Sequence, residues 1–195
     1  MKGSVWPDGL RRCPWANPSN PAYIRYHDEE WGVPVRDDRA LYEMLILECF
    51  QAGLSWECIL NKREAFRMAY AGFDPSKVAA FTEEDIERLM SDPGIVRNRT
   101  KIEASISNTR IFLEIAEESG TFSEYLWRWT GGSIVHENDR TTSPLSDAVS
   151  ADLKRRGMRF VGSVTMYSYL QAVGVIRSHL PGCFLCDRCR CTSME

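Results

Sequence analysis

Residues 41–56 read LYEMLILECFQAGLSW, and this stretch decides the fold class. Apolar residues such as Leu41 and Leu45 recur every third or fourth position, which places them on one face of a helix. The period predicts a helix over residues 38–53. Glu48 lies on the same face, so this helix carries an acid among its core-facing residues.

The helical period continues on both sides of this stretch, with capping residues at the expected starts. Further helices are predicted over residues 55–71 (capped by Ser55), from Asp74-Pro75, from Thr82, over 98–118, around 145–153, and around 164–173 (capped by Ser163). The stretch TGGSIVHENDRTTSP (130–144) is polar and rich in turn residues, which indicates a surface loop. No strand pattern is convincing, and we therefore predict an all-α fold.

Length and composition limit the possibilities further. The chain has 195 residues, of which 44% are hydrophobic, and we expect a single compact domain over residues 1–195, with a flexible cysteine-rich tail over 184–195. No apolar run has the roughly 20 residues of a membrane span, and the N-terminus lacks a signal-peptide pattern, so we expect a cytoplasmic protein. The net charge of −3 taken alone argues against a nucleic-acid partner, but it says nothing about a single face.

A carboxylate that faces a core is costly unless it is paired or hydrogen-bonded. Two interpretations of Glu48 start with about equal weight: it caps another helix or pairs with a buried arginine, or it binds a ligand. Aromatic residues cluster upstream, at Trp15, Tyr23, Tyr26, His27 and Trp31, and Trp56 follows downstream. Aromatic faces attract cations, and a carboxylate accepts hydrogen bonds from an exocyclic amine. Together these residues favour a flat cationic ligand such as a cationic purine.

Cysteine and histidine residues near the two ends form a candidate metal site. His179 and Cys183 are four residues apart, and Cys13 and His27 supply the same two residue types near the N-terminus. A Cys2His2 set is a standard tetrahedral zinc site. Spacing alone slightly favours a local four-thiolate site instead, formed by Cys183, Cys186, Cys189 and Cys191. A third alternative leaves free thiols in a disordered tail.

Residues 89–101 read LMSDPGIVRNRTK, in which a helix ends, a turn follows and a basic helix begins. Backbone amides at such a turn, around Gly94, bind phosphate. The cations that could add to them are Arg97, Arg99 and Lys101. The pattern is a degenerate form of a helix-hairpin-helix element. A second basic group comprises Lys154, Arg155, Arg156 and Arg159. The alternative for both groups is a solvated helix end, which fits 154–156 well and Arg97 poorly.

Seven motifs along the chain resemble the 3-methyladenine DNA glycosylase I family. They are RCPW (12–15), YIRYHDEEWGVP (23–34), LECFQAGLSW (47–56), FDPSKVA (73–79), GIVRNRTKI (94–102), RGMRFVGS (156–163) and SYLQAVGVIRSH (168–179). The resemblance is collinear from about Arg12 to Cys183, which makes it far more specific than any one motif. It implies an all-helical fold of the helix-hairpin-helix glycosylase superfamily.

The resemblance also implies roles for individual residues. The base pocket maps onto Trp15, Tyr26, Glu48 and Trp56, with Tyr23 and Trp31 nearby, and Gly53-Leu54 falls where the family inserts a wedge into DNA. The zinc ligands become Cys13, His27, His179 and Cys183, which join the two ends as a structural site. The remaining cysteines, Cys186, Cys189 and Cys191, are a departure that the resemblance does not explain.

The implied activity is hydrolysis of the bond between 3-methyladenine and deoxyribose in alkylated double-stranded DNA by a monomeric enzyme. The nucleotide must leave the duplex, and methylation at N3 makes the base a cationic, activated leaving group. Glu48 is expected as the catalytic residue that reads the cationic base, with water as the nucleophile. No lysine stands out as a Schiff-base nucleophile, so we expect no strand cleavage.

Two other classes of protein remain as alternatives to a glycosylase. A zinc-stapled protein that only binds damaged DNA would share the hairpin and the metal but would not need Glu48. A zinc deaminase would need an H-x-E arrangement, for which His27, Asp28 and Glu29 give a nominal match, but the P-C-x-x-C context is missing.

Overall fold

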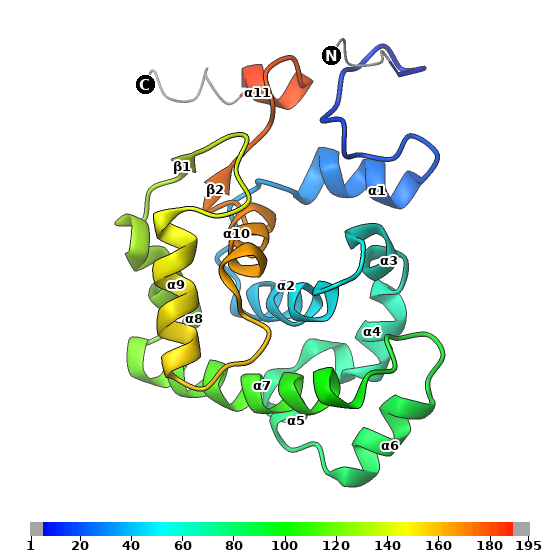
Figure 1. Cartoon of the computed structure of the whole chain (residues 1–195), viewed down its shortest axis with the longest axis vertical. Coiled ribbons are helices and arrows are strands. Elements are labelled where there is room, and N and C mark those ends of the chain that lie inside the picture. The colour runs from blue at the N-terminus through cyan, green and yellow to red at the C-terminus, as the bar shows by residue number, and fades with distance from the viewer. Residues whose placement is uncertain (1–5, 189–195) are drawn as a thin grey trace.

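The computed structural model describes residues 6–188, and nearly all of its regular elements are helices, which confirms the all-α prediction (Figure 1). In chain order the elements are α1 (Pro21–Arg25), the π-helix η1 (Tyr26–Glu30), α2 (Asp38–Gln51), α3 (Trp56–Asn61), α4 (Arg63–Ala69), the 3-10 helix η2 (Ala71–Phe73), α5 (Pro75–Ala79), α6 (Glu83–Ser91), α7 (Arg99–Ser119), α8 (Phe122–Trp127), the 3-10 helix η3 (Arg128–Thr130), β1 (Val135–His136), α9 (Pro144–Arg155), α10 (Ser163–Ala172), β2 (Ile176–Arg177) and α11 (Phe184–Arg188).

Helix α2 runs through the centre of the molecule (Figure 1). Every residue from Met44 to Phe50 is buried, and α10, α7, α8 and α3 pack around the helix. A helix buried on all sides is a core element rather than an amphipathic surface helix. Glu48 therefore lies inside the molecule because of where α2 lies, and not merely on its inner face.

Local capping explains most helix starts. Asp37 accepts a hydrogen bond from the Ala40 amide at the start of α2, and Ser55 and Asp74 cap α3 and α5 as predicted. The single helix predicted over residues 55–71 is wrong, because a single turn residue, Lys62 (φ −101°, ψ −1°), divides α3 from α4. The cap predicted at Ser163 is one residue late, since Gly162 precedes the first turn of α10.

One small parallel sheet was not predicted. Val135 in β1 pairs with Ile176 in β2, and the Val135 amide donates to the Val175 carbonyl at 2.9 Å. Strands of two residues are too short to show an alternating pattern. The pair fixes the loop that follows β1 beside the segment that follows α10, and both contribute to the pocket described below.

The two ends of the described chain meet at one end of the molecule (Figure 1). The Phe184 amide at the start of α11 donates to the Arg11 carbonyl at 2.8 Å. The predicted tail begins at residue 184; its first five residues form α11, and the remainder, with Cys189 and Cys191, lies outside the described residues.

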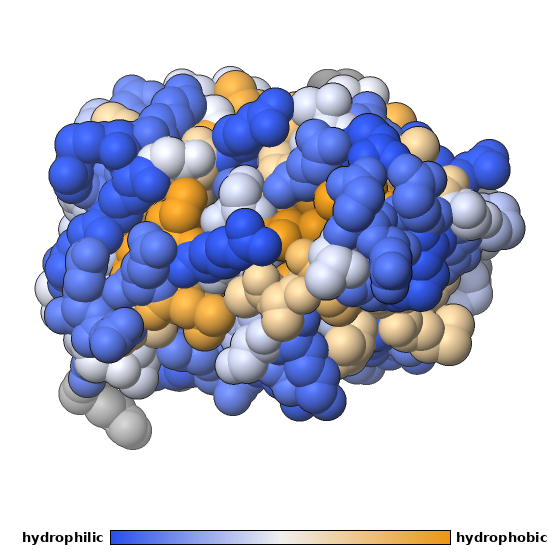
Figure 2. Space-filling model, turned by 90° about the horizontal axis from the view of Figure 1, so that it is seen from below, coloured by the Kyte–Doolittle hydropathy of each residue, from blue (hydrophilic) through white to orange (hydrophobic). Residues whose placement is uncertain are grey.

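Polar residues cover most of the face seen in Figure 2, with apolar side chains visible between them. Leu54 and Val164 are among the exposed large apolar residues of the described chain. No helix within residues 6–188 is long and apolar enough to cross a membrane.

Candidate functional site

A pocket of about 400 Å³ lies beside the C-terminal half of α2. It is lined by Trp15, Tyr23, Tyr26, Trp31, Glu48, Gln51, Trp56, Asp139, Arg140, Ser168, Gln171, Ser178 and Leu180. The volume falls in the range of small-molecule pockets, which begins at about 300 Å³. All six residues that the sequence proposed for base binding line this one pocket.

Five of these residues form an aromatic wall: Trp15, Tyr23, Tyr26, Trp31 and Trp56. The Trp15 ring centre lies 4.8 Å from that of Trp31 and 5.4 Å from that of Tyr23. Tyr26 lies 5.2 Å from Trp56, whose indole nitrogen is buried without a hydrogen-bond partner. Rings at these separations build a rigid apolar surface, and the unpaired indole N–H adds one donor to it.

Glu48 is the only acid in the lining that is buried, with 3% of its surface exposed. Its Oε2 has no hydrogen-bond partner, and Glu48 forms no ion pair within residues 6–188. This geometry excludes a helix cap or a buried arginine pair among the described residues. Burial raises the pKa of Glu48 to about 8, because the low-dielectric surroundings disfavour the carboxylate. The pocket therefore holds an acid whose charged form needs a positive partner.

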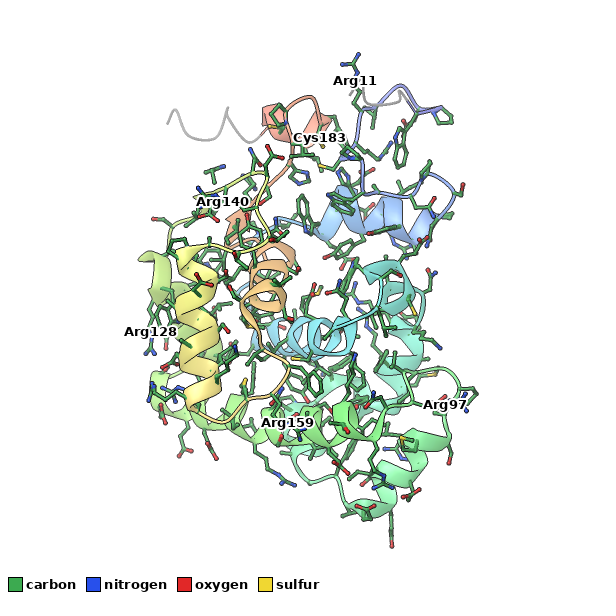
Figure 3. The ribbon with its side chains drawn as sticks, viewed as in Figure 1. Arg11, Arg97, Arg128, Arg140, Arg159 and Cys183 are labelled. Atoms are coloured by element: carbon green, nitrogen blue, oxygen red, sulfur yellow. The ribbon has the colours of Figure 1, made fainter. Side chains whose placement is uncertain are left out.

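Five polar residues of the pocket lining, here called the polar wall, were not predicted from the sequence. The polar wall consists of Asp139, Arg140, Ser168, Gln171 and Ser178, from the β1–α9 loop, α10 and the segment after β2. Figure 3 labels Arg140 on this loop. The Ser178 hydroxyl is buried and has no hydrogen-bond partner. The pairing of β1 with β2 holds this loop beside the segment after α10, and this long-range contact leaves no local signal in the sequence.

Cys13, His27, His179 and Cys183 form a buried Cys/His cluster, as predicted. Their candidate ligand atoms all lie within 4.8 Å of one another. The Cys183 Sγ is 3.6 Å from His27 Nε2 and 3.6 Å from His179 Nδ1. Two sulfurs and two imidazole nitrogens are the donor set of a tetrahedral structural zinc site. The alternative four-thiolate site needs Cys189 and Cys191, which lie outside the described residues.

Outer contacts orient both histidines. His27 Nδ1 donates to Asp28 at 2.7 Å, which turns Nε2 towards the sulfurs, and Arg12 holds the Asp28 carboxylate at 2.6 Å. His179 Nε2 contacts the Trp31 carbonyl at 3.2 Å, which leaves Nδ1 for the cluster. Carboxylate and carbonyl partners of this kind are typical behind metal-bound histidines.

The cluster and the aromatic wall are in direct contact. The Trp15 ring centre is 5.1 Å from that of His27, and Trp31 packs edge-on against His179 at 4.7 Å. The π-helix η1 supports this arrangement, because it buries two consecutive side chains, Tyr26 in the pocket wall and His27 in the cluster. Single π-helical turns are frequent at functional sites.

Residues 51–54 form the α2–α3 turn, at the edge of the pocket. The Leu54 amide donates to the Gln51 carbonyl at 2.6 Å, Ala52 has φ −47° and ψ 113°, and Gly53 has φ +81°. These values describe a type II turn, whose third position requires a positive φ and hence favours glycine. The turn presents Leu54, which is 39% exposed.

The α6–α7 hairpin (residues 92–98) differs from the expectation. The Gly94 amide donates to Asp92 at 2.7 Å, so it is already used within the loop. A Cβ at Gly94 would lie 2.8 Å from the Ala65 Cβ, so the glycine is needed for close packing on α4. Arg97 is exposed, projects away from the ribbon (Figure 3) and makes no hydrogen bond or ion pair within residues 6–188.

Two cations expected to contact DNA are otherwise engaged. Arg99 forms ion pairs with Glu83 and Glu87. Lys101 is 9% exposed and donates to the carbonyls of Phe50 at 2.8 Å and Ala52 at 2.5 Å. Lys101 was expected to add a charge contact to DNA, but its side chain is buried and bonded within the protein, which spacing along the sequence does not reveal.

The second basic group is mostly a solvated helix end. Arg155 and Arg156 both pair with Asp152, on the preceding turn of α9. Arg159 is exposed, and its backbone is held on both sides by the buried amide of Asn108, with two bonds of 2.8 Å.

Comparison with known proteins gives consistent matches. A family model described as Methyladenine glycosylase matches residues 15–186. The chain is 45% identical over 181 residues to DNA-3-methyladenine glycosylase 1 of Escherichia coli (strain K12), covering 89% of this chain and 96% of the relative. A crystal structure of 3-methyladenine DNA glycosylase I (TAG) matches with a TM-score of 0.85 and 44% identity, over 89% of this chain and 98% of that chain. A crystal structure of a tyrosine-to-phenylalanine variant of 3-methyladenine DNA glycosylase I (TAG), in complex with 3-methyladenine, matches with a TM-score of 0.82 and 39% identity. The match covers 85% of this chain and 92% of that chain.

Proposed function

Since the chain belongs to the 3-methyladenine DNA glycosylase I family and removes 3-methyladenine from DNA, we propose that Glu48 is the residue that reads the extruded base. The observation that carries this proposal is the buried, unpartnered carboxyl of Glu48 within a pocket of aromatic rings. A 3-methyladenine nucleotide is cationic, and its exocyclic amine donates hydrogen bonds. It therefore supplies the positive partner that the carboxylate lacks.

The aromatic wall would bind the flat face of the base. Trp15 and Trp56 border the space beside Glu48, and cation–π attraction to an indole contributes about 2 kcal/mol when the cation is desolvated. Burial raises the pKa of Tyr26 well above its usual value, so its hydroxyl stays protonated and remains a donor. A neutral adenine would leave Glu48 without its ionic partner, and this difference favours the methylated base.

The chemistry needs little from the protein beyond this environment. Extrusion costs a few kcal/mol, and the methylated base leaves easily because departure neutralises its charge. We assign Glu48 the catalytic role of holding the cationic base in place, and water the role of nucleophile. No lysine lines the pocket formed by the described residues, which supports base removal without a Schiff base or strand cleavage.

The Cys/His cluster fits a structural Zn²⁺, with Cys13 Sγ, Cys183 Sγ, His27 Nε2 and His179 Nδ1 as ligands. Four protein ligands leave no position for a substrate or a reactive water. The metal would supply cohesion between the two ends and, through His27 and His179, would hold the aromatic wall in place.

DNA contact is proposed for the surface around the pocket. Leu54 on the α2–α3 turn would fill the gap left by the extruded nucleotide, with Gly53 supplying the positive φ that the turn needs, and Arg97 would bind a phosphate. Because Gly94, Arg99 and Lys101 are engaged within the protein, they would act indirectly. We propose a monomer that acts on alkylated double-stranded DNA in the cytoplasm, a reducing compartment that suits buried free thiols.

The test is release of free base from methylated DNA, separated by chromatography. The wild-type protein should release 3-methyladenine, and Glu48→Gln should reduce the rate by about two orders of magnitude or more, equivalent to about 3 kcal/mol. A protein that binds damaged DNA but releases no base would refute the assigned chemistry. Release by Glu48→Gln at the wild-type rate would refute the role of Glu48 alone.

A further inference from the structure

Lys101 occupies an unusual position for a lysine. It lies in the first turn of α7, but its ammonium reaches the C-terminal end of α2, where it donates to Phe50 and Ala52. Among residues 6–188 no carboxylate lies within ion-pair distance of it. A buried cation without a counter-charge is costly, and the negative end of α2 compensates for only part of that cost.

The second carbonyl that Lys101 binds, that of Ala52, lies in the middle of the α2–α3 turn. Ala52 is the second residue of the α2–α3 turn, so its carbonyl belongs to the central peptide between Ala52 and Gly53. Type I and type II turns differ mainly in the orientation of this peptide, and glycine at the third position tolerates either. The 2.5 Å contact with the ammonium holds the carbonyl in the type II orientation.

We propose that Lys101 is a positioning residue for base extrusion, which acts by locking the central peptide of the α2–α3 turn. The lock fixes the direction in which Leu54 meets the DNA. Lys101 itself lies outside the pocket, because it is not among the residues that line the pocket. The proposal rests on the insertion role given above to the α2–α3 turn. It predicts that extrusion and pocket binding can be separated by a single substitution.

A second lysine offers a matched control. Lys62 also donates to two backbone carbonyls, those of Pro93 at 3.0 Å and Gly94 at 3.2 Å, but these belong to the α6–α7 hairpin. Lys62→Met removes the same charge and the same number of carbonyl contacts as Lys101→Met. It leaves the α2–α3 turn untouched.

The experiment compares two measurements on each purified full-length variant. One is the binding of free 3-methyladenine, followed by tryptophan fluorescence. The other is single-turnover excision from DNA at saturating enzyme. For Lys101→Met we expect free-base affinity within about twofold of wild type and an excision rate lower by about tenfold or more. Lys62→Met should lower DNA affinity and should slow excision at saturation less than Lys101→Met does.

Gly53→Ala is a second variant that disturbs the same turn, so the proposal can be tested even if Lys101→Met does not fold. A Cβ at Gly53 meets no atom within 4 Å, so the substitution opposes only the positive φ of the type II turn. It should reproduce the same separation, and the double variant should lose little more than the larger single loss, because both changes act on one peptide.

Equal loss of free-base binding and excision in Lys101→Met would overturn the proposal, as would excision at the wild-type rate. Fully additive losses in the double variant would also overturn it. Failure of the proposed function has a different signature, namely wild-type protein that releases no base or unaffected release by Glu48→Gln.

Discussion

Glu48 shows how position within a helix determines the charge of a single residue. Its neighbours on α2 are apolar and buried, and burial raises its pKa from 4.5 to about 8. The neutral acid is therefore favoured in the folded protein near pH 7. A cationic base bound beside Glu48 would reverse this preference, since a positive charge nearby favours the ionised form and displaces the proton.

The raised pKa predicts a pH-dependent stability penalty. Below about pH 4.5 Glu48 is protonated in both the folded and unfolded states; as pH rises towards 8 only the unfolded state ionises freely, so folding is progressively disfavoured. Glu48→Gln removes this penalty. Urea unfolding should show that the variant gains stability over wild type by a few kcal/mol between pH 5 and pH 8.5, at about 1.4 kcal/mol per pKa unit. A constant difference across this range would contradict the raised pKa.

The same pKa predicts a pH dependence of activity. About half of Glu48 in the free enzyme is ionised at pH 8, so kcat/KM for excision should rise from pH 6 through pH 8 and level off about one pH unit above the pKa. The measurement is initial rates at limiting DNA with ionic strength held constant. A profile that is flat over this range would mean that the carboxylate is not required in its charged form.

The burial of Glu48 could be predicted from the sequence and the burial of Lys101 could not, because the two depend on contacts at different distances along the chain. The apolar period of its own helix places Glu48 among core-facing residues and is readable in the sequence, although α2 proves to be buried on all sides. The burial of Lys101 depends on carbonyls some 50 positions earlier (the contact to Phe50 spans 51 residues), and nothing in the basic stretch around it indicates that contact.

At the scale of elements, helices with local caps could be predicted from the sequence. The breaks within a predicted helix, which depend on tertiary packing, could not. The apolar period runs through Lys62 without a change, although α3 and α4 separate there. The β1–β2 pair brings Asp139 and Arg140 to the pocket, and a pairing of two residues leaves no pattern in either segment. The polar wall was therefore beyond prediction, while the aromatic wall was not.

The α6–α7 hairpin offers its own prediction. Arg97→Ala should weaken binding to undamaged and damaged DNA alike and reduce the slope of log K against log salt by about 0.9, the value for one phosphate contact. Arg99→Ala is the matched control, because Arg99 is already paired with Glu83 and Glu87 and should change the slope less. Fluorescence anisotropy over a salt series gives both slopes. An unchanged slope for Arg97→Ala would leave it as a solvated residue.

At the scale of the whole molecule, the Cys/His cluster connects segments 166 residues apart along the chain. Cys13→Ser should abolish stoichiometric metal, and a loss of about 3 kcal/mol would lower Tm by roughly 6–12 °C for a chain of this size. Cys58→Ser is the control, since Cys58 lies outside the cluster and is only partly buried. Metal analysis and thermal unfolding report the two effects, and equal behaviour of the variants would argue against a metal role.

The connection between the ends also orders events during protein synthesis. The ribosome makes Trp15, Tyr26 and His27 first, but the partners that support them, His179 and Cys183, emerge last. Until then the aromatic wall lacks its backing, however well the central helices have folded. We therefore expect chains that end before residue 183 to capture no base, because they lack at least one of the four residues of the cluster.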